Sequence, residues 1–255
     1  PMSVDMAKMK SEFLSHYYRK FYMTIKDRVI SNMPKLIWLL KISNPIINTL
    51  NKLPIFSQII EWFGFSSKRS LPVVENQKPL KEIYNDQANL EKKVILFADT
   101  FNINFEIKNL MYAIKVLNKF GYQAIIPSFQ KDNLDRPLCC GRTYISLGQL
   151  DKAKKELERF TKYISDNGYN ELPVVGIEPS CLLTFSDEFK SFSKLKDRNK
   201  IKNEFFLLEE FIFNEIKNGN KINSKNFNKN VLIHGHCHQK SQNRIKGLTN
   251  LLNEL

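Results

Sequence analysis

Val94-Ile-Leu-Phe97 is the stretch that decides the fold of this 255-residue chain. It is a short apolar run bounded by polar residues, a pattern typical of a strand buried within a sheet. Residues 104 to 119 follow with apolar side chains at helical spacing, and Gly121-Tyr-Gln-Ala-Ile-Ile-Pro127 then supplies a second strand. A strand, a helix and a second strand in succession favour an α/β fold built on a mostly parallel sheet.

The same alternation continues along the chain. A charged amphipathic helix is expected from Leu150 to Ile164, a third strand from Leu172 to Ile177, a helix near 203 to 217, and a fourth strand at Val231-Leu-Ile-His234. We therefore predict an α/β, parallel-sheet domain over residues 93–255.

The first part of the chain has a purely helical pattern. Residues 5–32 predict one amphipathic helix that ends before Pro34, with an apolar stripe made of Met6, Met9, Phe13, Tyr17, Phe21 and Ile25. Residues 36–65 predict short helices, because the apolar sequence is interrupted by Lys41, Pro45, Lys52 and Pro54. No run reaches the about 18 apolar residues that a transmembrane helix needs. We predict an α-helical region over 1–65 and a linker over 66–92.

The apolar stretch from 36 to 65 has two interpretations. It packs against the rest of the protein, or it makes an interfacial membrane contact through Trp38, Trp62 and neighbouring lysines. Four cysteines are too few for a disulfide scaffold, and the N-terminus has no secretory signal. We therefore expect a reducing, cytoplasmic location. If residues 36–65 contact a membrane, the protein would lie peripherally on the inner membrane face.

The formal net charge of +13 raises nucleic acid as a partner. Lys and Arg number 11 against 5 Asp and Glu in residues 1–75, 16 against 15 in residues 76–190, and 12 against 6 in residues 191–255. The excess thus lies in the flanks, and the Asn-rich stretch from Lys217 to Asn230 is typical of a polar, mobile loop. No aromatic-rich basic motif accompanies this charge, so we expect no nucleic-acid partner.

All four cysteines and three of the four histidines lie in three short segments. These are Cys139-Cys-Gly-Arg142, Gly176-Ile-Glu-Pro-Ser-Cys181 and His234-Gly-His-Cys-His-Gln-Lys240, and Asp99-Thr-Phe-Asn102 precedes them. Three of the four segments directly follow predicted strands, and ligands bind at the carboxyl ends of parallel strands. Thiolates are soft ligands, so this pattern points to one site for iron–sulfur or zinc.

These segments resemble the cysteine-rich CCG domain found in heterodisulfide reductase and in the glycolate oxidase and D-lactate dehydrogenase type of iron–sulfur enzymes. The long FAD-linked oxidase form is most similar, since it carries phrases like Gly148-Gln-Leu-Asp151 and Glu178-Pro-Ser-Cys181. The resemblance covers about residues 94 to 241. It extends more faintly to Val4-Asp-Met-Ala-Lys-Met-Lys10, which looks like the segment that follows a ferredoxin-like domain.

The resemblance implies an iron–sulfur cluster of the 4Fe-4S type, with an opened, non-cubane form as the alternative. Carried over by position, its ligands are Cys139, Cys140, Cys181 and Cys237. The same resemblance places seven other residues beside the cluster, as supporting groups or further ligands: Asp99, Gly141, Arg142, Glu178, His234, His236 and His238. In the full family pattern a cysteine precedes the CCG run and a pair follows it, and here Asp99 and Glu178 stand at the nearest positions.

The family further implies FAD on a separate domain, and flavin and ferredoxin-like domains as partners in the same or a companion polypeptide. We expect this chain to be a fragment that lacks those domains and a second CCG half, and that is not catalytically complete alone. The implied function is electron transfer within a flavin-dependent 2-hydroxyacid dehydrogenase acting on D-lactate, glycolate or D-2-hydroxyglutarate. A quinone or a membrane-surface acceptor would receive the electrons.

Several simpler interpretations stay open at this stage. The adjacent cysteines could be inert thiols in a turn, and Cys181 could be a residue at a helix start with a lowered thiol pKa. Cys237 and its neighbouring imidazoles could form a zinc site, with His234 and His238 on one face of an extended segment and His236 on the other. Arg142 could hold an anion or form a structural salt bridge, and Lys8 and Lys10 are expected on a solvated face. A metal-free scaffold is the last alternative.

Overall fold

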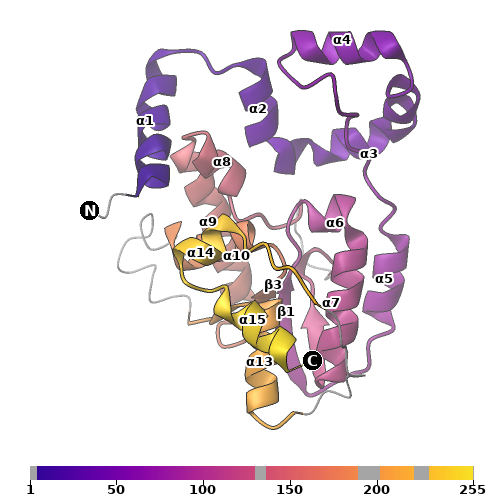
Figure 1. Cartoon of the computed structure of the whole chain (residues 1–255), viewed down its shortest axis with the longest axis vertical. Helices are drawn as coiled ribbons and strands as arrows, with labels where there is room; N and C mark the ends of the chain where they lie inside the picture. Colours follow the sequence, from indigo (N-terminus) through magenta and orange to yellow (C-terminus); the bar gives the residue numbers. More distant parts are fainter. Residues whose placement is uncertain (1–4, 130–135, 189–201, 221–229, 255) are drawn as a thin grey trace.

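The computed structural model describes residues 5–129, 136–188, 202–220 and 230–254. Figure 1 shows two parts along the long axis of the molecule: a set of helices from the first third of the chain at one end, and a sheet covered by helices at the other. Most of the Asn-rich stretch between 217 and 230 lies outside the described residues.

The sheet has four parallel strands in the order β2-β1-β3-β4. They are β1 (Lys92–Phe97), β2 (Tyr122–Ile125), β3 (Val174–Gly176) and β4 (Phe205–Leu207). Ile95 is in register with Ile125 of β2 and with Val174 of β3, so β1 lies in the middle of the sheet. The predicted α/β fold with a parallel sheet is confirmed.

Alternate side chains of β1 enter two separate cores. Val94 and Leu96 pack on one face, against the helices α5 (Lys78–Asn85), α7 (Ile107–Lys119) and α13 (Leu208–Lys217). Ile95 and Phe97 pack on the other face, against α9 (Leu150–Asp166) and α10 (Pro179–Ser186). A strand covered on both faces is apolar throughout, which is why Val94 to Phe97 shows no polar alternation.

Four short elements connect these layers or extend them. They are α6 (Asn102–Phe105), the 3-10 turn η1 (Pro127–Phe129), α8 (Arg142–Ser146) and α14 (Cys237–Ser241). A final helix, α15 (Lys246–Asn253), packs against α13. The elements α8, α10 and α14 all lie near the carboxyl ends of the strands, where the functional site is built (Figure 1).

The expected fourth strand at residues 231–234 is wrong. That segment has no regular structure, and the fourth strand is instead β4, which lies within the stretch expected to be helical from 203. A strand needs a neighbouring backbone for its hydrogen bonds, and β4 holds the place beside β3. Val231 and Leu232 are left exposed to solvent, Leu232 almost completely at 98%.

The helical region differs from the expectation at two points. The predicted single helix over 5–32 is split into α1 (Met6–Lys20) and α2 (Ile25–Ser31), because the Thr24 side chain accepts a hydrogen bond from the Asp27 amide and starts a new helix. The helix α3 (Met33–Leu50) runs through Pro45 without stopping, and α4 (Pro54–Trp62) follows after one turn.

The apolar stripe of α1 faces solvent. Met6, Met9, Phe13 and Tyr17 are all exposed, whereas Ser11 on another face of the helix is only 4% exposed. The Ser11 hydroxyl donates a hydrogen bond of 2.5 Å to the Ile145 carbonyl of α8. The helix therefore docks through the face that carries Ser11, and its predicted apolar stripe points outward.

Two asparagines fasten the following segment to α3. The side-chain amide of Asn44 donates to the Val74 carbonyl at 2.6 Å and accepts from the Val74 amide at 3.0 Å. Asn51 makes the same pair of bonds with Leu71, both at 3.0 Å. The stretch expected as a linker is thus held in place, and it contains α5, whose Leu80 is completely buried in the core.

No described helix combines the length and the apolar character needed to cross a membrane.

Candidate functional site

Three of the four cysteines meet in the core beside the carboxyl ends of β1 and β3. Cys139 and Cys140 precede α8, and Cys181 lies in the first turn of α10; all three are at most 5% exposed. Side-chain hydrogen bonds join Cys139 to Cys140 and Cys140 to Cys181. The structure therefore brings together three thiols that are 42 residues apart at their extremes in the sequence.

Backbone amides point at two of these sulfurs. The Gly141 N–H donates to Cys139 Sγ at 3.3 Å, and the Arg142 N–H donates to Cys140 Sγ at 3.4 Å. Gly141 makes this possible with a left-handed conformation, φ +79°, that other residues rarely adopt. Donors aimed at sulfur stabilise a thiolate, and hydrogen bonds of this kind tune iron–sulfur centres.

The three thiols lie close enough for each to shift the pKa of its neighbour. The pKa of Cys139 is raised well above its ordinary value, first by the bond that it donates to Cys140 and then by burial. In Cys140 the bond from Cys139 favours the thiolate, but the bond donated to Cys181 and burial outweigh it, so its pKa is also raised well above the ordinary value. All these sulfurs are therefore protonated at neutral pH.

Cys181 does not have the lowered pKa considered for a thiol at a helix start. The bond from Cys140 lowers its pKa, but burial and the neighbouring carboxylates of Asp99 and Glu178 raise it further, and the net shift is upward. The interpretation of Cys181 as a helix-start thiol with a lowered pKa is wrong, because the cost of burying a charge exceeds the gain from the helix N-terminus.

Asp99 stabilises the loop after β1 through hydrogen bonds. Its Oδ1 accepts from the amides of Phe101 and Asn102 at 2.9 and 3.1 Å, and its Oδ2 accepts from the Asn102 side chain at 2.6 Å. Burial raises the pKa of this carboxyl, against these hydrogen bonds. Asp99 lies close enough to Cys181 and Glu178 to interact with both electrostatically.

Glu178 likewise serves the start of a helix. It is the N-cap of α10, and its Oε1 accepts from the Ser180 amide at 3.1 Å and from the Ser180 hydroxyl at 2.5 Å. This cap fixes the first turn of α10 and hence the position of Cys181. Asp99 and Glu178 thus lie beside the thiols, and local hydrogen bonds occupy both oxygens of Asp99 and Oε1 of Glu178.

Arg142 links the thiol loop to two other elements. Its guanidinium pairs with Glu188, at the end of α10, and its Nη2 lies 2.8 Å from Nε2 of His238. Burial, followed by the charge of Arg142, lowers the pKa of His238. The neutral imidazole can therefore accept the Arg142 bond, and of the two roles considered for Arg142 the structure has the salt bridge.

The segment from His234 to Lys240 is organised around a helix cap. His236 is the N-cap of α14: its Nδ1 accepts from the His238 amide at 3.2 Å, and the Gln239 side chain accepts from the His236 amide at 3.1 Å. The rings of His236 and His238 lie 5.3 Å apart, edge to face. The expected extended segment with these two histidines on opposite faces is wrong, because the chain turns into α14 between them.

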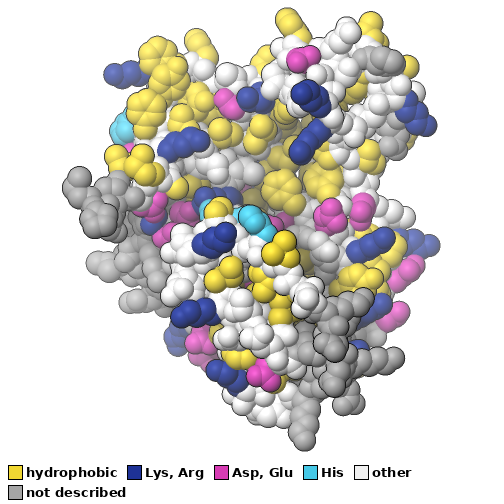
Figure 2. All heavy atoms as spheres, in the orientation of Figure 1, with side chains coloured by type: hydrophobic (Ala, Val, Ile, Leu, Met, Phe, Trp, Pro, Cys, Tyr) yellow, Lys and Arg dark blue, Asp and Glu magenta, His cyan; other side chains and the backbone are white. Residues whose placement is uncertain are grey.

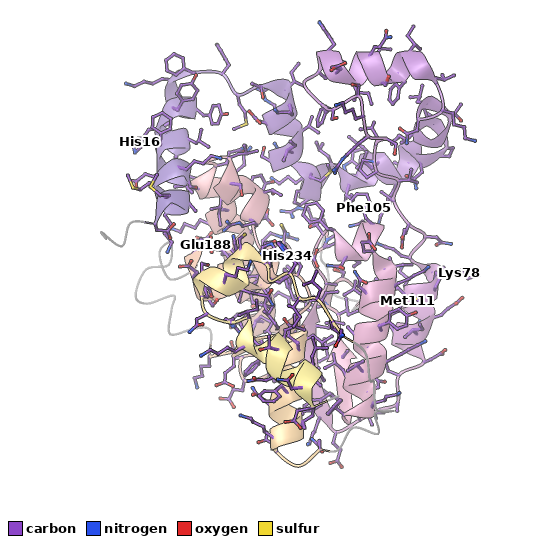
Figure 3. The ribbon with its side chains drawn as sticks, viewed as in Figure 1. His16, Lys78, Phe105, Met111, Glu188 and His234 are labelled. Atoms are coloured by element: carbon purple, nitrogen blue, oxygen red, sulfur yellow. The ribbon has the colours of Figure 1, made fainter. Side chains whose placement is uncertain are left out.

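Cys237 lies apart from the other thiols. It is exposed at the start of α14, and the contact recorded for its Sγ is His236 Nδ1 at 3.8 Å. Its helix packs against α10, which carries Cys181. His234 is exposed, and Figure 3 shows it on the segment that leads into α14.

The cysteine thiols of this site meet some, but not all, of the requirements of a metal or iron–sulfur centre. Three buried thiols and two N–H···S bonds are the right chemistry for one. The described residues nevertheless contain no group of three or more His, Cys, Asp or Glu already arranged around one ion position. This holds for Cys237 and the imidazoles as much as for the buried thiols.

A hollow of about 480 Å³ opens next to the thiol loop, between α1, α8 and the end of α10. Lys8, Arg142 and Glu188 are among its lining residues. Lys8 pairs with Asp187 at 2.6 Å and with Asp5 at 3.4 Å, and its side chain is still 41% exposed, so Lys8 and Lys10 both lie on a solvated face as expected. The ion pair fastens α1 to the end of α10.

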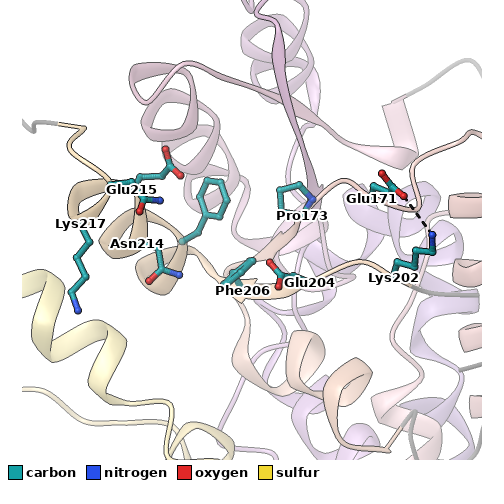
Figure 4. Close-up of a pocket in the computed structure, with 10 residues that line it drawn as sticks. Glu171, Pro173, Lys202, Glu204, Phe206, Asn214, Glu215 and Lys217 are labelled. Carbon is teal, nitrogen blue, oxygen red and sulfur yellow. Dashed lines mark ion pairs between the residues drawn. The ribbon is translucent and has the colours of Figure 1, made fainter. Parts of the chain in front are cut away.

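A second hollow, of about 670 Å³, lies at the opposite ends of the strands (Figure 4). Pro173 and Glu204, which directly precede β3 and β4, line it together with residues of α13. Its ion pair, Lys202 with Glu171, is exposed on both sides. This hollow is remote from the thiols, and we assign no functional site to it.

Sequence reasoning missed the acidic residues that complete the site. Glu188 is 7% exposed and burial raises its pKa, and Asp187 holds Lys8. Neither belongs to a motif, and both follow Ser186 at the end of an apolar helix. The one available signal was an Asp-Glu pair about one helical length after Cys181, which is weak because such pairs commonly face solvent.

Comparisons with known proteins find distant relatives among dehydrogenases. The chain is 20% identical to D-2-hydroxyglutarate dehydrogenase of Haemophilus influenzae over 202 residues, which are 74% of this chain and 19% of that protein. It is 24% identical to the C subunit of anaerobic glycerol-3-phosphate dehydrogenase of Escherichia coli over 200 residues, 76% of this chain and 48% of that polypeptide. No family model matches the chain, and no solved structure does.

These matches make the chain a distant relative of oxidoreductase polypeptides. It spans about a fifth of the length of the D-2-hydroxyglutarate dehydrogenases and about half of the glycerol-3-phosphate dehydrogenase polypeptide.

Proposed function

We propose that this chain is an iron–sulfur electron-transfer module of a larger flavin-dependent dehydrogenase. The observation that carries the proposal is the buried set Cys139, Cys140 and Cys181, joined by hydrogen bonds and met by two backbone N–H donors. An iron–sulfur cluster held there would accept and release single electrons. The distant similarity to dehydrogenase polypeptides supports an oxidoreductase role.

The chain's own residues would divide the work as follows. The three buried thiols supply the ligands that are already together, and Cys237 would be the fourth, brought in by α14. Arg142 positions α14 through His238, and Glu188 balances the charge of Arg142. Glu178 caps the helix that carries Cys181, and Asp99 shapes the neighbouring loop after β1.

The rest of the reaction belongs to portions outside this chain. We place FAD on a separate domain or companion polypeptide, where a 2-hydroxyacid such as D-2-hydroxyglutarate, D-lactate or glycolate would be oxidised. A quinone or a similar acceptor would take the electrons from this module. The names of the relatives support a dehydrogenase reaction, and their greater length is consistent with further portions that carry it out.

The test is anaerobic purification and reconstitution with ferrous iron and sulfide. We expect a brown protein that contains iron and acid-labile sulfide and absorbs broadly in the blue. Cys140→Ser should remove most of this iron and absorbance, because Cys140 is the central thiol of the three. Bound zinc without sulfide, or no metal at all, would contradict the proposal.

Ile164→Val is the matched control. Ile164 is fully buried in the same core as Cys140, so the change removes a core methyl group and leaves every sulfur in place. We expect the control to bind as much iron as the unchanged protein. If it loses iron as Cys140→Ser does, the effect of the cysteine variant reports core damage rather than a lost ligand.

A further inference from the structure

Exposed apolar side chains are concentrated in one part of this molecule. Among the described residues, 21 large hydrophobic side chains are exposed, and 17 of them lie between Met6 and Phe63. The other four are scattered over the α/β part: Phe101, Tyr112, Val231 and Leu232. Apolar exposure on this scale marks a surface that contacts something other than water.

The helices α3 and α4 present this exposure as two regular stripes. Trp38, Ile42 and Ile46 recur every four residues on α3 and are 56, 71 and 62% exposed, whereas Ile37 and Ile47 on the other face are buried. Ile55, Ile59 and Trp62 repeat the pattern on α4 at 65, 49 and 83%. We call these six residues the α3–α4 apolar surface.

This surface lies at the end of the molecule opposite the sheet (Figure 1). Figure 2 shows hydrophobic and basic side chains side by side at that end. Between residues 33 and 63 the basic residues are Lys35, Lys41 and Lys52, all exposed, and the acidic residue is Glu61. Residues 1–75 carry 11 Lys and Arg against 5 Asp and Glu.

We propose that the α3–α4 apolar surface binds the interface of an anionic phospholipid membrane. Helices that lie in a membrane interface combine an aliphatic stripe with tryptophans and bordering lysines, as α3 and α4 do. The central part of a protein–protein interface is instead depleted of lysine. Since no described helix can cross a bilayer, the contact is with the membrane surface. The proposal does not depend on a metal at the thiol site.

Tryptophan fluorescence is a direct probe, because Trp38 and Trp62 are the two tryptophans of the whole sequence. Both are exposed in the absence of lipid. We expect their emission to shift to the blue when the full chain meets vesicles of phosphatidylcholine mixed with phosphatidylglycerol, and brominated lipids should quench it. Vesicles of phosphatidylcholine alone should give a much weaker response, since they lack the negative charge.

Variants then separate the apolar contribution from the charge. Trp38→Ser with Trp62→Ser should weaken vesicle flotation at least about ten-fold, since two large apolar side chains leave the membrane. Lys41→Glu with Lys52→Glu should weaken binding to the anionic vesicles by about ten-fold or more while both tryptophans remain.

Each pair has a matched control on the α/β part. Tyr112→Ser with Leu232→Ser removes two exposed apolar side chains there, and Lys108→Glu with Lys119→Glu reverses two exposed charges on α7. Neither control should change flotation.

Unchanged emission and no flotation with anionic vesicles would overturn the proposal. So would a blue shift that appears without lipid as the protein concentration rises, together with dimers in light scattering, because a second copy would then cover the surface. Equal losses in the controls and in the α3–α4 variants would also contradict it.

Discussion

At the scale of single residues, the site is decided by which thiols lose contact with water. Cys139, Cys140 and Cys181 share a buried environment, and the pKa of each thiol is raised. Cys237 is exposed. The buried and the exposed cysteine thiols of this chain should therefore differ in reactivity, although all four are chemically the same group.

Alkylation should separate the two kinds of thiol in the metal-free protein. At neutral pH iodoacetamide should label Cys237 first, and the buried thiols should react far more slowly because burial excludes the reagent and their raised pKa values keep them protonated. Their rates should increase as the pH rises toward those values, since the thiolate is the reactive form. Mass spectrometry of the digested protein measures each site.

Denatured protein is the control for this experiment, and all four thiols should react there at similar rates. Fast labelling of Cys140 in the folded protein would contradict the buried arrangement. After reconstitution with iron and sulfide, protection of Cys237 would support its role as the fourth ligand, and unchanged labelling would exclude that role.

The sequence predicted the thiol residues better than their surroundings. Four cysteines stand out in a chain of this length, and the loops after β1 and β3 were predictable from the apolar runs that precede them. The partners Glu188 and Asp187 were not, because a carboxylate gives no local signal that it will be buried against an arginine 46 residues away. Likewise, the sequence alone did not show that His236 would cap a helix rather than extend a strand.

At the scale of elements, the sequence pattern of α1 correctly predicted a helix, but its apolar face is exposed rather than packed against the protein. Its apolar residues recur at helical spacing, as predicted, yet Ser11 and Ser15 lie on the side that approaches the rest of the protein. Gly148, in the turn before α9, has φ +68°, and a Cβ built on it would lie 2.5 Å from the Ser15 amide nitrogen. The other nearest atoms belong to Leu14, so the backbone of α1 leaves room only for a glycine at position 148.

Gly148→Ala should therefore undock α1. The left-handed conformation alone costs an alanine about 1–2 kcal/mol, and the clash with the α1 backbone should add about 1–3 kcal/mol. Urea unfolding measures the loss in free energy of unfolding.

Gly168→Ala isolates the first of these costs. Gly168 has nearly the same φ, +69°, and a Cβ there would meet nothing within 4 Å. We expect it to lose only the conformational part. Equal losses in the two variants would show that α1 does not approach Gly148 as described.

The strands illustrate the opposite outcome. Three of the four were predictable because a run such as Val94 to Phe97 is apolar on both faces, which few other structures tolerate. The run Val231 to His234 looks similar but pairs with none of the strands that the structure describes. Pairing is a property of two segments, so a single segment cannot reveal whether it will be paired.

At the scale of the whole molecule, stability is unevenly distributed. Within the described part of the chain, the three clusters of buried hydrophobic residues contain no residue before Leu80. The helices α1 to α4 are attached mainly by individual contacts, such as the ion pair of Lys8 with Asp187 and the amide bonds of Asn44. Regions with few buried apolar contacts open locally at low cost.

Hydrogen exchange should reveal this division. Amides of β1, β3, α7 and α9 should exchange slowest, and those of α3 and α4 should exchange faster by orders of magnitude, because opening them exposes little buried apolar surface. Mass spectrometry of peptides after timed exchange measures both. Uniform protection from α3 to α9 would mean that the helices and the sheet unfold together.

The docking of α1 through the face that carries Ser11 has a consequence for how the chain can change over evolutionary time. Selection for correct folding would constrain Ser11, while the exposed Phe13 and Tyr17, whose rings contact each other and their neighbours Tyr18 and Phe21, could drift toward polar residues without disturbing the docking of α1. Where descendants of this sequence keep those aromatic side chains, the docking of α1 is not what preserved them.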